Sequence, residues 1–123
     1  MSAEIVCLMM TLRDQVKIYH WQTMSFPRHK ATDELVGKLD ENIDKFVEVY
    51  MGKYGRPKLS GRTGLIKIRN FHDQEAPALL NSAIEWLTTK LPGYLKNTDT
   101  DLLNIRDEIL ADLNQTLYLF TLN

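Results

Sequence analysis

Apolar residues recur at helical spacing along almost the whole 123-residue chain, and this periodicity limits the possible folds more than any other feature. Pro27 suits the first turn of a helix, where its missing N–H costs nothing. Thr98 and Asp101 have the spacing of a capping box at the start of the last helix. The spacing therefore predicts an all-α protein with four helices, at about residues 3–23, 27–54, 77–90 and from 98 onward.

The three predicted links differ in length, and their order suggests a topology. The first and third are short, whereas "GKYGRPKLSGRTG" opens a long link rich in glycine and basic residues. A long link in the middle allows the second and third helices to run parallel, as in a ferritin-like four-helix bundle with a long crossover. Long loops in other helical folds give the same pattern. At this length residues 1–123 form a single domain.

Charge and cysteine content exclude several classes of protein. The formal net charge is −1, so the chain as a whole does not attract nucleic acid. The single cysteine, Cys7, excludes an intramolecular disulfide and a cysteine-rich zinc site. The first residues lack the pattern of a signal peptide, and no stretch is apolar enough to span a membrane. We therefore expect a cytoplasmic protein without a membrane partner.

Acidic residues line one face of the second predicted helix. At about 100° per residue, one face carries His29, Asp33, Asp40, Asp44 and Glu48, opposite the apolar stripe. Spacing alone favours an ordinary solvated face for such a row.

Three residues on the same face argue against simple solvation. Val36 and Val47 are apolar, and Gly37 lies in the helix interior, where glycine costs about 1 kcal/mol relative to alanine. A glycine is better explained where another backbone packs closely. This favours a packed interface on this face.

The row contains two potential ligand pairs that cannot serve one metal within one chain. Asp33 and Asp44 are 11 residues apart, or about 16 Å along a helix axis. When two copies of one helix pack antiparallel about a twofold axis, every pair of facing residues has the same sum of residue numbers. The pairs 29 and 48 and 33 and 44 both sum to 77, so one axis level with residues 38 and 39 brings His29 near Glu48 of a second copy. The same axis, beside Gly37, brings Asp33 near the second copy's Asp44. We therefore hypothesise two sites shared between two copies.

Imidazole and carboxylate ligands suit Fe(II), Mn(II) or Zn(II) better than Cu(I). His20, near the end of the first helix, could complete such a site from the side. For a single histidine, a hydrogen-bonded place in the core is the simpler interpretation.

The segments "YHWQ", "HKATD" and "DKFVE" resemble the motifs of the Dps mini-ferritins. The resemblance implies a ferroxidase centre with His20, His29 and Asp33 from one subunit and Asp44 and Glu48 from its twofold partner. It implies that the protein oxidises Fe(II) with peroxide or O₂ for iron detoxification or storage, as a homodimer or a larger shell. Zn or Mn could occupy the same site. The His20–His29 link is shorter than in that family, and the family's basic N-terminal arm is absent, so we do not expect DNA binding.

Other interpretations stay open. The chain could be a catalytically silent helical dimer that serves as a structural or interaction protein. The basic residues of 53–69 could bind phosphate or nucleic acid, although only Tyr54 and Phe71 flank them as stacking candidates. His72, Asp73 and Glu75 could hold a metal, but a capped helix start explains them more simply.

Overall fold

The computed structural model describes residues 2–122 as four α-helices without a strand in that range. The predicted all-α class is confirmed, and most helix ends fall close to the predicted positions. The third helix, predicted to reach Lys90, keeps α-helical geometry only to Glu85. Beyond α3 the chain continues through a π-helical turn, η1 (Trp86–Lys90), and a 3₁₀ turn, η2 (Leu91–Tyr94). The helices are α1 (Ser2–Gln22), α2 (Phe26–Tyr54), α3 (Ala76–Glu85) and α4 (Thr100–Leu119).

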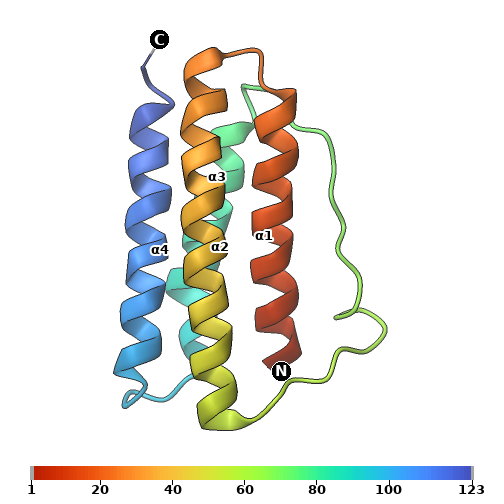
Figure 1. Ribbon diagram of the computed structural model, residues 1–123, viewed down its shortest axis with the longest axis vertical. Helices are drawn as coiled ribbons and strands as arrows, with labels where there is room; N and C mark the ends of the chain where they lie inside the picture. The colour runs from red at the N-terminus through yellow and green to blue at the C-terminus, as the bar shows by residue number, and fades with distance from the viewer. Residues whose placement is uncertain (1, 123) are drawn as a thin grey trace.

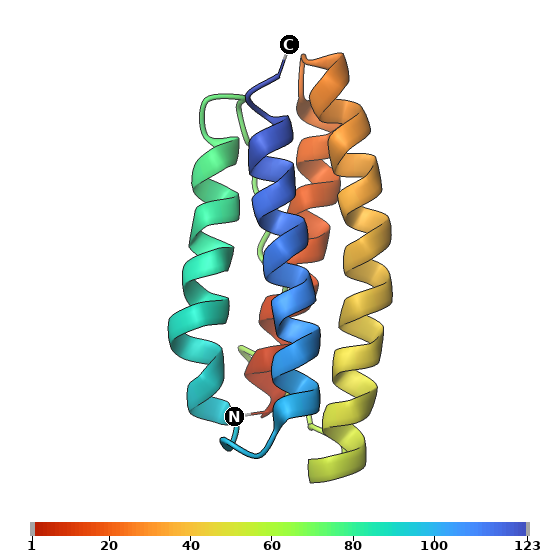
Figure 2. The ribbon, with the colours of Figure 1, turned by 90° about the vertical axis from the view of Figure 1, so that its left-hand side faces the viewer.

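The helices form one bundle in which α2 and α3 run in the same direction (Figure 1). After α2 the chain returns along the outside of α1 to the end where α2 begins, and α3 starts there. The close helix pairs are α1 with α2, α2 with α4, and α3 with α4. Figure 2 shows α3 and α4 side by side, with α1 behind them. The bundle therefore has an up-down-down-up order with one long crossover.

The core comes from the apolar stripes that the spacing predicts. Leu39 and Phe46 of α2 and Leu113 of α4 are fully buried. Ser25 caps α2, because its side chain accepts a hydrogen bond from the backbone N–H of Arg28 at 3.3 Å. Pro27 occupies the first turn, as predicted.

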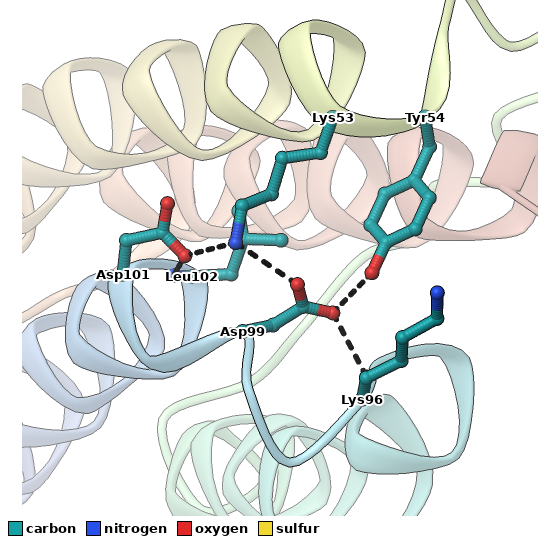
Figure 3. A network of polar contacts seen from close by, with 6 residues as sticks. All are labelled: Lys53, Tyr54, Lys96, Asp99, Asp101 and Leu102. Atoms are coloured by element: carbon teal, nitrogen blue, oxygen red, sulfur yellow. Dashed lines mark hydrogen bonds and ion pairs between the residues drawn. The ribbon is translucent and has the colours of Figure 1, made fainter.

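The capping box predicted for the last helix is wrong. The N-cap of α4 is Asp99, and Thr98 lies outside the helix. The carboxylate of Asp99 accepts hydrogen bonds from the backbone N–H of Lys96 at 2.8 Å, from the Tyr54 hydroxyl and from Lys53 Nζ at 2.9 Å (Figure 3). These bonds lower the pKa of Asp99 to about 2. Asp99 therefore joins the end of α2 to the start of α4, which explains why it is used instead of Thr98.

The crossover, residues 55–75, is hereafter called the strap. Two glutamines of α1 fasten its backbone. Gln15 donates to the Arg69 carbonyl at 2.6 Å and accepts from the Arg69 N–H at 2.9 Å. Gln22 accepts from the Phe71 N–H at 2.9 Å. These contacts satisfy strap backbone groups that no helix or sheet pairs.

None of the helices within residues 2–122 combines the length and the apolar character needed to cross a membrane.

Candidate metal site

The predicted ligand row lies on an open face of α2. His29, Asp33, Asp44 and Glu48 are all exposed, on the side away from the buried stripe. The two valines interpreted as part of this face are not on its surface. Val36 is buried and Val47 packs against the core, because both lie towards the packed side of α2. Gly37 is exposed, and a Cβ there would meet nothing within 4 Å.

His20 and His29 meet at the turn between α1 and α2. Their rings stack with centroids 3.9 Å apart and planes 16° from parallel. His20 Nδ1 lies 2.8 Å from the His29 carbonyl oxygen, and His29 Nδ1 lies 2.9 Å from the His20 carbonyl oxygen. A carbonyl oxygen can only accept, so each Nδ1 carries the proton in these bonds. Each Nε2 therefore keeps its lone pair, and an imidazole with a free Nε2 lone pair is the form that ligates a metal.

The stacked rings constrain what the two imidazoles can bind. Each Nε2 lone pair lies in its ring plane, so nearly parallel rings cannot both direct a lone pair at one ion. In this arrangement the two Nε2 lone pairs are directed at two separate positions. Burial, followed by the neighbouring His29, lowers the pKa of His20, which favours the neutral form.

A polar network holds this turn in place. Thr32 donates to the Arg28 carbonyl at 2.7 Å and accepts from His20 Nδ1 at 3.0 Å. Asp73 accepts from the Tyr19 hydroxyl at 2.7 Å, and Arg28 Nη1 donates to the Asp73 carbonyl at 2.7 Å. The side chains around His20 are therefore fixed by partners from both helices and the strap.

This network also decides the role of His72, Asp73 and Glu75. Asp73 joins the strap to the α1–α2 turn instead of capping α3. Glu75 is the N-cap residue of α3, but its side chain makes no cap bond to that helix. It accepts from the His72 N–H at 3.0 Å and pairs with Arg69. The side-chain cap that we predicted for this segment is wrong, because these carboxylates bind the strap and the turn.

The acidic half of the predicted site is a pair of neighbouring carboxylates. A hydrogen bond with Asp44, together with its charge, raises the pKa of Glu48. Asp33, Asp44 and Glu48 have no cationic partner within the described part of the chain. Like charges held this close are relieved by a bound cation.

One chain does not assemble a complete metal site. Among residues 2–122, no three His, Cys, Asp or Glu side chains lie close enough together to hold an ion. His20 and His29 are brought together, and Asp44 lies beside Glu48. Asp33 is near enough for its charge to oppose in part the lowering of the His20 pKa, but it does not form a three-ligand group with the histidines.

A groove of about 400 Å³ runs beside the acidic pair, between α1 and α2. Val6, Met10 and Val47 provide its apolar part, and Asp44 lies on its edge. Arg13 crosses it and binds both carboxylate oxygens of Asp40, at 2.8 and 3.3 Å. Sequence reasoning missed Arg13, because a partner 27 residues away has no local spacing signal.

The structure defines an all-α four-helix protein in which four of the five predicted ligands are exposed on α2 and the fifth, His20, is buried in α1. The chain belongs to a family of unknown function (DUF5856), which matches residues 20–120 and so spans all five predicted ligands. It is similar to an uncharacterized 14.6 kDa protein in the mobD–ri intergenic region of Enterobacteria phage T4, with 40% identity over 53 residues. That alignment covers 43% of this chain and 41% of the phage protein. No solved structure matches the chain significantly.

Proposed function

We propose that this protein is a Dps-like ferroxidase that oxidises Fe(II) with peroxide or O₂ at sites shared by two twofold-related copies. The observation that carries the proposal is the His20–His29 pair, in which each Nδ1 proton is bound by a carbonyl oxygen and each Nε2 therefore keeps its lone pair. His29 is exposed, whereas His20 is buried. The up-down-down-up helix order with one long crossover, the ferritin-type order, also supports it.

In this proposal Fe(II) is the substrate. Because the stacked rings cannot ligate one ion together, His20 and His29 would ligate separate Fe(II) ions. Asp33 of the same copy and Asp44 and Glu48 of the partner would supply the carboxylates. Carboxylates favour the higher charge of Fe(III), and they are hard oxygen ligands suited to either oxidation state. Two Fe(II) ions give up one electron each, and one peroxide molecule takes both electrons and two protons to become two water molecules. The reaction removes Fe(II) and peroxide together.

Three features of the α2 face support a second copy as the missing partner. Gly37 leaves space for another backbone beside the proposed axis. The groove next to Asp44 offers apolar surface, including Met10, which is 41% exposed. Within residues 2–122, Asp33, Asp44 and Glu48 lack cationic partners, whereas Asp40 of the same row pairs with Arg13. At the level of the axis, the side chain of Lys38 contacts Gln115 of α4 and Leu39 is buried, so neither blocks the approach.

The second candidate is a catalytically silent helical dimer. One observation favours it: Asp33 does not join the histidines in a three-ligand group. In that case the stacked histidines would only fasten the α1–α2 turn. The two candidates share the interface and differ in metal binding.

An anaerobic Fe(II) titration followed by peroxide or O₂ tests the proposal. The wild-type protein should bind Fe(II) saturably and produce ferric absorbance faster than the buffer does. Asp33→Ala should lose both properties, whereas Glu34→Ala should keep them, because Glu34 is also exposed but points about 100° away on the helix. Equal behaviour of wild type and Asp33→Ala would favour the silent dimer.

A further inference from the structure

A second hollow lies on the opposite side of α1 from the ligand row. This cavity has a volume of about 370 Å³ and is lined by α1, the strap, α3 and η1, with α2 and α4 at its base. Its walls are mainly apolar side chains, among them Met9, Leu12, Phe71, Leu79 and Trp86. At about 100° per residue, the cavity residues Thr11 and Gln15 lie about 160° around α1 from Arg13. None of the predicted metal ligands lines this cavity, although Ile43 lines both the cavity and the groove beside Asp44.

The cavity exists because one edge of the bundle is not closed by helix packing. The close pairs do not include α1 with α3, so the strap covers this edge instead. The two hydrogen bonds between the Gln15 side chain and the Arg69 backbone hold the strap over the opening. The volume falls within the range of about 300–1,000 Å³ that is usual for small-molecule pockets.

One wall of the cavity departs from regular helix geometry. Trp86 and Leu87 line it from η1, the π-helical turn. The Leu87 carbonyl accepts a hydrogen bond from Arg106 Nη1 of α4 at 3.0 Å. Such turns are uncommon and occur frequently at functional sites.

The charges at the mouth indicate the chemistry of a ligand. Lys67 and Arg69 are exposed at the cavity, and none of the lining residues is acidic. Arg69 pairs with Glu75 at 3.2 Å, whereas Lys67 makes no ion pair within the described residues. An anionic group at Lys67 would therefore gain a partner, while an apolar tail would fill the cavity.

We propose that this cavity binds an aliphatic monocarboxylate of medium chain length, with its carboxylate at Lys67 and its hydrocarbon tail between α1 and α3. The site takes up the molecule without altering it. The apolar walls account for binding of the tail, and the Lys67 ammonium accounts for the preference for an acid.

Decanoate is the probe for the test, used below its micelle concentration. Its binding is measured by isothermal titration and by the fluorescence of Trp86 in a Trp21→Phe background, since Trp21 is the only other tryptophan and is 64% exposed. We expect saturable binding with one molecule per chain and a change in Trp86 emission. Lys67→Ala should weaken binding roughly two- to fivefold, as for an exposed ion pair. Lys58→Ala, a strap lysine outside the cavity, should leave it unchanged.

A cavity-filling variant provides the second test. Ala83→Phe places a ring in the cavity and should abolish binding, whereas Ala78→Phe, on the exposed side of the same helix, should not. If Ala83→Phe does not fold, the Trp86 signal in the Trp21→Phe protein decides the location. No saturable binding, no Trp86 response, or binding that survives Ala83→Phe in a folded protein would overturn the site. Equal affinity for decanol and decanoate would overturn the role of Lys67.

Discussion

Mixing the Asp33→Ala and Glu48→Ala proteins should restore part of the iron-binding activity if two copies share each site, as proposed. In the proposed dimer, Asp33→Ala damages the half of the site that contains the histidines, and Glu48→Ala damages the acidic half. Each homodimer of a single variant has both sites damaged. In a mixed dimer, one site takes both damaged positions, and the other takes the intact Asp33 of one chain and the intact Glu48 of its partner.

The size of the recovery follows from random exchange of subunits. Equal amounts of the two variants give about one half mixed dimers, and each has one intact site of two. About a quarter of the wild-type sites should therefore return. Both residues are exposed, so the substitutions should change stability by less than about 0.5 kcal/mol.

The assay is Fe(II) binding and oxidation before and after exchange, which mild denaturant or dilution promotes. Asp44→Ala mixed with Glu48→Ala is the matched control. Both changes fall in the acidic half, so every site keeps one damaged position and no recovery is expected. Activity near a quarter of wild type for the first mixture and near zero for the second supports shared sites. Equal outcomes for the two mixtures would refute the geometry.

Three further predictions concern the fold and the interface. Gly37→Ala should raise the free energy of unfolding of the monomer by about 0.5–1 kcal/mol, because alanine favours the helix more than glycine does. The same substitution should weaken self-association in sedimentation experiments. Unchanged association would argue against an axis beside Gly37. Asp99 has its pKa lowered from 3.8 to about 2, so its stabilising effect is complete above pH 4 and is lost as the pH falls towards 2. Asp99→Asn should therefore be less stable than wild type at pH 7, with the difference in urea unfolding shrinking below pH 4, and a constant difference would contradict this. Gln15→Ala removes both hydrogen bonds to the Arg69 backbone, which should lower stability by about 0.5–1.5 kcal/mol per bond and speed hydrogen exchange in the strap. Unchanged exchange would show that Gln15 does not hold the strap in place.

The helices and the exposed acidic face of α2 could be predicted from the sequence because both depend on local spacing. Leu39 and Phe46 repeat at helical intervals, and Asp44 and Glu48 are one turn apart. The existence of the long crossover also followed, from its glycines and its basic residues. These features need no knowledge of which segments meet in space.

The rest of the site depends on contacts between distant residues. Glutamine is a residue type that usually faces solvent on a helix, so nothing in the sequence marks Gln15 or Gln22. Only the folded chain shows that both bind the strap, about 50 residues later. Asp99 was missed for the same reason, since its partners Lys53 and Tyr54 belong to another helix. The spacing of His20 and His29 could not predict that their rings stack, because that depends on the path of the turn between them.

The most direct test of the account is a crystal structure of the protein loaded anaerobically with Fe(II), with anomalous data collected at the iron edge. We predict a twofold dimer with iron density between His20, His29 and Asp33 of one copy and Asp44 and Glu48 of its partner. A dimer that uses another face, or a dimer across this face without iron density at these residues, would contradict the central claim.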